Sequence, residues 1–353
     1  MSSDQPAVPI LDLRPYTDGG NEPNARASAA SQMDAACRSG SGFVAARLPM
    51  NGVDEQLVNK AFAAAKLLFD QPEEHKLKQM RRLTAETNCG YSPLSVEALD
   101  RARGPDRKEA FNIRKPGVHH NDYSGCPPGF KEAAETLWNA LEAVATGTCE
   151  CAADALGLGD TKFFSRTLSK WDQVTLRFLH YPPCDWAGGD PPVRCGAHTD
   201  FGLFTFLFVL GGEEGLQVKK IQGSTVSDAD ACTDAGWVPA KVPCDDLCCI
   251  INTGALTARW TNDNYQATAH RVVVPTEGAA SRHRYSIAFF VDPDEDAMVS
   301  VLEWLLTDLL FALVDVVANS VHCGIGQLTR ATCFMRTYWS HHGSGFQHGS
   351  ALQ

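Results

Sequence analysis

Residues 196–204 read GAHTDFGLF, where a histidine and an aspartate two positions apart precede an apolar run. Side chains two residues apart on a β-strand point to the same face of the sheet. His198 and Asp200 are therefore expected to direct an imidazole and a carboxylate toward one point. An isolated pair of this kind is usually a surface feature, so the rest of the sequence must decide whether it belongs to a metal site.

A redox iron site with open coordination positions uses two histidines and one carboxylate on one side of the ion. The third ligand should therefore come from another strand. His270, in YQATAHRVVVP (265–275), opens a β-branched run 70 residues after Asp200 (270 − 200 = 70). His283 also lies downstream, but the arginines on either side of it would repel a cation. By itself, His270 also fits a hydrogen-bonded core histidine.

The strand RYSIAFFVDP (284–293) carries a second pair of polar side chains on one face, Arg284 and Ser286. A buried arginine without a partner is costly, so its guanidinium should meet an anion. A guanidinium and a hydroxyl aimed inward together suit one terminal carboxylate. Alone, the pair also fits a structural salt bridge at a strand end. Beside the two histidines and the aspartate, a bound carboxylate is the favoured interpretation.

The order of the expected elements predicts an α+β protein. Apolar periodicity and helix-boundary residues predict helices in three segments, 24–40, 53–80 (interrupted at Pro72) and 128–156. A stretch rich in Gly, Pro and Asp, 84–127, is expected to be irregular. From 171 to 293, short apolar runs separated by turns predict an antiparallel sandwich or barrel, with GGEEG (211–215) as a hairpin loop.

Composition limits the possible partners and compartment. The net charge of −11 argues against a nucleic acid or an anionic membrane surface as the main partner. The N-terminus shows no secretory signal, and three acidic residues interrupt the most apolar stretch, 299–321, which disfavours a membrane span. The 13 cysteines, an odd number, cannot all pair within one chain, so scattered reduced thiols in a cytoplasmic protein are expected.

These motifs together resemble the iron(II)/2-oxoglutarate-dependent dioxygenases, specifically the isopenicillin-N-synthase-like branch. The resemblance rests on HTD (198–200), His270 and RYS (284–286). It extends to PILDL (9–13), SGFVAARLPMNGV (41–53), FDQPEEHKLK (69–78), DRKEAF (106–111), LRFLHYPP (176–183) and GLQV (215–218). It implies a double-stranded β-helix (jelly-roll) core with flanking N-terminal helices. The chain then divides into an N-terminal helix and strand region (1–127), a long helix with the oxygenase core (128–293) and an atypical C-terminal tail (294–353).

The resemblance also implies a ligand set. Three residues would hold Fe(II) and three would contact 2-oxoglutarate: His198, Asp200 and His270 for the metal, and Arg284, Ser286 and Tyr181 for the co-substrate. Leu179 stands where many relatives have asparagine, so one hydrogen bond to the co-substrate is expected to be absent. Ala255, in NTGAL (252–256), replaces the usual aspartate, which is expected to affect the local turn.

The implied reaction uses Fe(II), 2-oxoglutarate and O₂, with ascorbate as a supporting reductant, to oxidise a C–H bond of a small molecule with release of succinate and CO₂. Strand parity makes Phe290 a candidate substrate contact, and Phe111 and Tyr91 are candidates to cover the mouth of the site. For each of the three, core packing is the favoured explanation. Two alternatives stay open. One is a 2-oxoglutarate-independent oxidase like isopenicillin N synthase or aminocyclopropanecarboxylate oxidase, and the other is a non-catalytic jelly-roll binding protein. We expect a monomer.

Overall fold

The computed structural model describes residues 8–19, 22–38, 40–186, 188–210, 215–219, 236–242 and 247–302. The strands in this part of the chain are β1 (Ile10–Leu11), β2 (Phe43–Arg47), β3 (Gly90–Ser92), β4 (Glu109–Arg114), β5 (Thr175–Tyr181), β6 (Val193–His198), β7 (Phe204–Val209), β8 (Leu216–Lys219), β9 (Trp237–Pro239), β10 (Cys248–Thr253), β11 (His270–Val273) and β12 (Arg284–Val291). The α-helices are α1 (Arg14–Thr17), α2 (Pro23–Arg38), α3 (Glu55–Phe69), α4 (Glu73–Gln79), α5 (Phe130–Ala155), α7 (Ala255–Trp260) and α8 (Glu277–Ala280).

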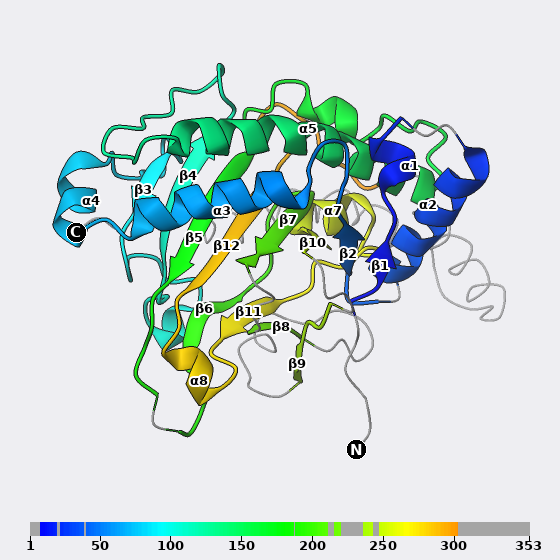
Figure 1. The fold of residues 1–353 in the computed structure, drawn as a ribbon. Coiled ribbons are helices and arrows are strands. Elements are labelled where there is room, and N and C mark those ends of the chain that lie inside the picture. Colours follow the sequence, from blue (N-terminus) through cyan, green and yellow to red (C-terminus); the bar gives the residue numbers. More distant parts are fainter. Residues whose placement is uncertain are drawn as a thin grey trace, which may run out of the picture.

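The described strands form two sheets (Figure 1). The larger has eight strands in the order β1-β2-β10-β7-β12-β5-β4-β3, and the smaller has four in the order β6-β11-β8-β9. β1 runs parallel to β2, and the other ladders between these strands are antiparallel. The α+β class and the two-sheet jelly-roll core predicted from the sequence are confirmed.

One face of the large sheet packs against the long helices α3 and α5, which lie across it (Figure 1). Alternation along β5 turns Phe178 to this side, where its ring centroid lies 5.1 Å from that of Phe130 at the start of α5. Trp138, further along α5, meets Phe289 of β12 edge-on at 5.0 Å. The helices therefore bury one side of the sheet and leave its other side for the second sheet.

The residues at the ends of α3 and α4 explain where these two helices begin and end. Asp54 caps α3, because its carboxylate accepts the N–H of Leu57 at 2.7 Å. α3 ends at Phe69, and α4 begins directly after Pro72, which suits a helix start because it has no N–H to leave unpaired. The interrupted helix predicted over this segment is confirmed.

The other face of the large sheet meets the small sheet. A second apolar core lies between them, with members from β2, β5, β10 and β12 on one side and β6, β8 and β11 on the other: Phe43, Ala45, Leu179, Tyr181, Cys195, Leu216, Val218, Cys248, Ile250, Val272 and Ala288. Because β5 alternates, its odd-numbered residues face this inner core while Phe178 faces the helices. The candidate site residues on β5, β6, β11 and β12 therefore lie between the two sheets.

Two expectations about the strands are wrong. GGEEG (211–215) does not join a hairpin, because β7 pairs with β10 and β12 in the large sheet whereas β8 pairs with β9 and β11 in the small one. Residues 211–214 themselves lie outside the described part. The stretch 84–127 is not wholly irregular, since β3 and β4 extend the large sheet. Both strands are buried on both faces, so neither shows the alternating pattern of a half-exposed strand.

The tail prediction falls mostly outside the described residues, which end at Leu302. The backbone N–H of Leu302 donates to the carbonyl of Trp260 at 3.0 Å. In the part of the chain that the structure describes, no helix has the length and apolar character that crossing a bilayer requires.

The cysteines follow the expectation with one exception. Eight described cysteines are free thiols, but Cys248 at the start of β10 forms a disulfide bond. The odd cysteine count excludes only complete pairing, so it could not exclude this bond.

Candidate metal centre

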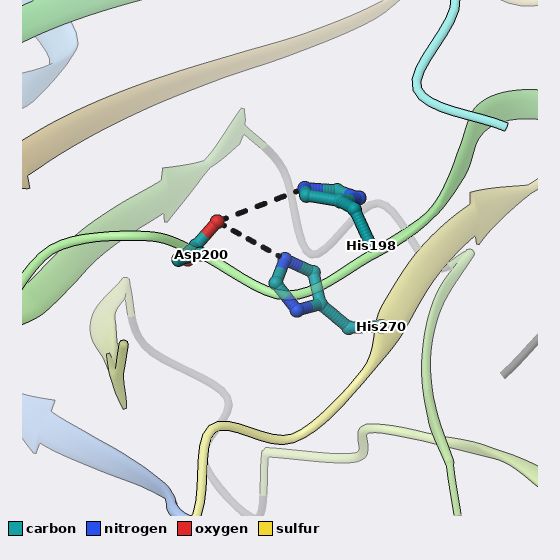
Figure 2. Close-up of side chains that lie close together, drawn as sticks. All are labelled: His198, Asp200 and His270. Carbon is teal, nitrogen blue, oxygen red and sulfur yellow. Dashed lines mark ion pairs between the residues drawn. The ribbon is translucent and has the colours of Figure 1, made fainter. Parts of the chain in front are cut away.

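The side chains of His198, Asp200 and His270 converge between the two sheets (Figure 2). Nε2 of each histidine lies 3.7 Å from Oδ1 of Asp200, and the three ligand atoms all lie within 4.8 Å of one another. A metal ion with bonds of about 2.0–2.2 Å holds its ligand atoms about 3–4 Å apart, so these donors are close to a binding geometry. Two imidazoles and one carboxylate are the donor set that iron(II) uses in oxygenases.

Strand pairing brings the two histidines together. His198 ends β6 and His270 begins β11, and the two residues lie directly opposite in the antiparallel ladder. Asp200 is placed differently from the expectation, because β6 ends at His198 and the aspartate lies in the turn beyond it. Its carbonyl accepts the N–H of Ala255 at 2.8 Å. The turn packs tightly on the start of α7, where a Cβ on Gly254 would lie 2.2 Å from a backbone oxygen of the turn.

Backbone carbonyls fix the tautomers of both imidazoles. Nδ1 of His198 lies 2.8 Å from the carbonyl oxygen of Gly196, and Nδ1 of His270 lies 3.2 Å from that of Thr268. A carbonyl only accepts, so each Nδ1 carries the ring proton. Each Nε2 therefore keeps its lone pair, and Figure 2 shows both rings presenting a nitrogen to the carboxylate.

Asn252 positions the carboxylate, and the sequence analysis did not single it out. Its Nδ2 donates to Oδ2 of Asp200 at 2.7 Å, which leaves Oδ1 directed at the histidines. Its signal in the sequence is an amide inside the otherwise apolar segment CCIINTG (248–254), next to a glycine. An amide in such a place needs a polar partner, and here the partner is a metal-ligand candidate.

The protonation states also fit a metal. Burial, together with the neighbouring His270, lowers the pKa of His198 to about 4, so this imidazole is neutral at pH 7. Burial opposes the charge of Asp200, but the two histidines and the Asn252 hydrogen bond hold its pKa below the usual value. Metal binding needs neutral imidazoles and an ionised carboxylate. The residues present therefore fit Fe(II).

Arg284 lies on the same inner face and has spare hydrogen-bond donors. It is 1% exposed and sits opposite Tyr181 in the β12–β5 ladder, with its guanidinium carbon 5.0 Å from the tyrosine ring centroid. Nη1 donates to the hydroxyl of Ser286 at 3.5 Å, whereas Nε and Nη2 have no partner among the described residues. A buried guanidinium without a counter-charge is costly, so these donors are suited to an anionic ligand.

The other predicted site residues divide into two groups. Leu179 lies opposite Ser286 and offers no hydrogen bond, and Phe290 packs partly buried against the inner core. The structure does not bring Phe111 and Tyr91 to the site. Both are 1% exposed in the core between the sheet and the helices, and the Tyr91 hydroxyl donates to Glu109 at 2.5 Å. They face the helices because their strands turn these residues to the outer side of the sheet.

Comparison with known families gives matches over most of the described chain. Residues 8–128 match the family described as "non-haem dioxygenase in morphine synthesis N-terminal", and residues 172–293 match the 2OG-Fe(II) oxygenase superfamily. The second match contains all three metal-ligand candidates and the buried arginine.

Individual relatives agree. The chain is 31% identical over 307 residues to the proline hydroxylase buaE of Petromyces alliaceus, covering 82% of this chain and 90% of that protein. It is 25% identical over 321 residues to homoarginine-6-hydroxylase of Arabidopsis thaliana, covering 86% and 90%. The crystal structure of a full-length Neurospora crassa protein in complex with alpha-KG (2-oxoglutarate) superposes with a TM-score of 0.70 at 27% identity, covering 86% of this chain and 91% of that one. The protein is thus an enzyme that uses iron and 2-oxoglutarate, and the chain belongs to the 2OG-Fe(II) oxygenase superfamily.

Proposed function

We propose that the three converging side chains hold Fe(II) and that the residues around the buried guanidinium bind the distal carboxylate of 2-oxoglutarate: His198, Asp200 and His270 for the metal, and Arg284, Ser286 and Tyr181 for the co-substrate. The observation that carries this assignment is the pair of unpartnered guanidinium donors on the inner face that holds the metal donors. Bound iron and 2-oxoglutarate supply the chemistry that oxidises a substrate C–H bond, with succinate and CO₂ as co-products.

The protein's own part in the reaction is binding, orientation and exclusion of water. Arg284 would form charge-assisted hydrogen bonds to the co-substrate carboxylate, which fixes the opposite end of 2-oxoglutarate toward the metal. Ser286 adds a hydroxyl on the same face. Leu179 adds only apolar contact, so binding depends on the arginine more than in relatives with asparagine there. Asp200 and His270 are 7% and 8% exposed, which limits competing water.

We further propose that the substrate is a small polar molecule and that Phe290 contacts its apolar part. We also propose that the protein is a cytoplasmic monomer and belongs to the isopenicillin-N-synthase-like branch. Two relatives are named for hydroxylation of proline and homoarginine, and the Neurospora crassa protein has been solved with thymine and with 5-formyluracil. These ligands support the substrate class. The matched family regions end at residues 128 and 293, which supports the domain boundaries predicted from the sequence.

Substitution of the buried arginine tests the proposal. Arg284→Met is expected to raise the KM for 2-oxoglutarate about 100-fold, because the co-substrate carboxylate loses its charged partner in a buried place. Arg284→Lys should recover part of the affinity, since it keeps the charge but not the planar fork. The measurement is succinate formed from labelled 2-oxoglutarate with Fe(II) and ascorbate.

The matched control is Arg14→Met, because Arg14 is 62% exposed and, within the described residues, its side chain pairs with Asp12 at the surface. Its KM should equal that of the wild type. An unchanged KM in Arg284→Met would contradict the co-substrate assignment. Oxygen consumption that does not depend on 2-oxoglutarate would instead favour an oxidase of the isopenicillin N synthase or aminocyclopropanecarboxylate oxidase type.

A further inference from the structure

The inner face of the large sheet continues past the proposed co-substrate residues. Pairing between β12 and β5 sets the inward side chains in four successive rows: Arg284 with Tyr181, Ser286 with Leu179, Ala288 with Arg177, and Phe290 with Thr175. The two strands lie side by side in the middle of the sheet (Figure 1). The first two rows hold the co-substrate residues. The last two rows are therefore the part of this face that is left for the substrate.

The metal ligands lie at the level of the later rows. Asn252 shares the row of Phe290 through the intervening strand β7, and it donates to Asp200 at 2.7 Å. Arg177 lies four residues from Tyr181 along β5, which is about 14 Å at about 3.4 Å per residue. Arg177 lies in the row next to the one that Phe290 shares with Asn252, and it therefore faces the same space between the sheets as the metal donors.

Arg177 pairs with Glu97 but does not use all of its hydrogen-bond donors. Its Nη2 donates to both carboxylate oxygens of Glu97, at 2.6 and 2.5 Å. Within the described residues, its Nε and Nη1 donate to no other group, and its side chain keeps 16% exposure. The neighbouring ion pair of Lys108 and Asp106 is buried, with 3% exposure for each side chain. Arg177 is therefore the cation of this charge cluster that keeps both solvent access and unused donors.

Glu97 does not compete for the role of binding group. It already accepts from Arg177 and from the Ser92 hydroxyl at 2.9 Å, and Lys108 lies 3.4 Å away. Burial opposes its charge, but Arg177 and Lys108 lower its pKa to about 2, so it remains a carboxylate. Its hydrogen bonds are used within the cluster. The N–H groups left on Nε and Nη1 of Arg177 lie on different edges of the guanidinium, and each can donate a charge-assisted hydrogen bond to an oxygen of a carboxylate.

We propose that Arg177 binds a carboxylate of the primary substrate, so that the molecule oxidised is a small carboxylic acid. The inference rests on the proposed function, because it needs the substrate to lie beside the proposed metal. Arg177 would act through position and charge, holding one end of the substrate while Phe290, in the next row, contacts its apolar part. It is thus a specificity-determining residue for the oxygenase reaction.

Matched acids and amides test the inference. The purified enzyme is incubated with Fe(II), ascorbate and labelled 2-oxoglutarate. The candidate substrates are the common L-amino acids and a set of aliphatic and aromatic monocarboxylic acids, and each acid is compared with its primary amide. Succinate above the substrate-free background is measured. We expect at least one acid to stimulate turnover about tenfold or more, and its amide to have a kcat/KM on the order of 100-fold lower.

Variants at position 177 distinguish a role of Arg177 in substrate recognition from a purely structural role. Arg177→Gln is expected to lower kcat/KM for the stimulating acid about 100-fold, while iron content and the KM for 2-oxoglutarate stay unchanged. Arg177→Lys should recover part of the activity, because it keeps the charge. Glu97 keeps its contacts to Ser92 and Lys108 in both variants. The matched control is Arg166→Gln, which breaks an exposed pair with Asp160 and should match the wild type.

Three results would overturn the inference in an enzyme that turns over 2-oxoglutarate: no acid stimulates it, the amides equal their acids, or Arg177→Gln leaves the kcat/KM of the acid unchanged. If Arg177→Gln does not fold, Arg177→Lys decides. A reduced preference for acid over amide supports the inference, and an unchanged preference overturns it. Absence of both iron binding and 2-oxoglutarate turnover in the wild type would contradict the proposed function and the inference with it.

Discussion

The Asp200→Ala enzyme is expected to form succinate at least about a thousandfold more slowly than the wild type. Asp200 supplies the only carboxylate among the three converging donors, and its Oδ1 lies 3.7 Å from Nε2 of each histidine. Without it, two neutral imidazoles remain. They bind iron(II) weakly, because the anionic ligand that offsets part of the charge of the metal is gone.

The rate is measured as labelled succinate at saturating Fe(II) and 2-oxoglutarate. Asp190→Ala is the matched control, because Asp190 is an exposed aspartate on the loop before β6 and should leave the rate unchanged. Thermal unfolding of both variants checks that the fold is kept. A rate for Asp200→Ala within tenfold of the wild type would show that the carboxylate is not a metal ligand.

Glu109→Gln is expected to destabilise the fold by about 3 kcal/mol. Glu109 lies on the helix-facing side of the large sheet and accepts hydrogen bonds from Lys76 at 2.8 Å, Tyr91 at 2.5 Å and His180 at 2.7 Å. The side chains of Lys76 and Glu109 are only 8% and 6% exposed. The neutral amide would leave the ammonium of Lys76 buried without a counter-charge, which costs far more than an exposed pair contributes.

The measurement is the free energy of unfolding from urea titrations at pH 7. Glu132→Gln is the matched control, because Glu132 is 73% exposed and its pair with Lys60, at 2.9 Å, lies in solvent. The control should change stability by no more than about 0.5 kcal/mol. A loss below about 1 kcal/mol in Glu109→Gln would contradict the buried ion pair.

The same variant should show a defined pH dependence. Burial opposes the charge of Glu109, but its hydrogen bonds from His180, Lys76 and Tyr91 hold its pKa below the usual value. A carboxyl whose folded pKa is lowered stabilises the fold above its unfolded pKa of about 4.3, and this contribution is lost as pH falls through the folded pKa. The difference from the wild type should therefore be full at pH 7 and narrow below about pH 4.

The metal ligands could be predicted from the sequence because residue type and strand parity carry the information. His198, Asp200 and His270 stand next to apolar, β-branched runs, and the family motifs agree with them. His283 could be set aside for its flanking arginines. The structure adds a second reason, since Nδ1 of His283 lies 2.8 Å from Nε2 of His180, whose ring stacks on Phe69 on the helix-facing side.

The contacts that position the site could not be predicted, because they depend on how distant segments meet. Asp200 lies beyond its strand, and its carbonyl is held by the backbone N–H of Ala255. A backbone donor does not depend on the side chain, so an alanine at position 255 keeps this contact. The pairing of Arg177 with Glu97 joins residues 80 positions apart. Nothing in the sequence near either residue indicates its partner.

The positions of the two substrate candidates that the structure does not bring to the site have a physical cause. Phe111 and Tyr91 lie in a stretch whose glycines, prolines and aspartates suggested a loop near the mouth of the site. The structure places them on strands β4 and β3, paired with each other across the ladder. Aromatic side chains on strands buried on both sides can face either core, and only the tertiary register decides which.

Anaerobic binding of labelled 2-oxoglutarate, measured by equilibrium dialysis with and without Fe(II), tests the central claim most directly. The wild type should retain one iron and one 2-oxoglutarate per chain, with tight binding of 2-oxoglutarate only when iron is present. His270→Ala should retain neither, whereas His120→Ala, at an exposed histidine, should retain both. Equal binding of iron and 2-oxoglutarate by the wild type and His270→Ala, or no binding by the wild type, would contradict a ferrous centre between the two sheets.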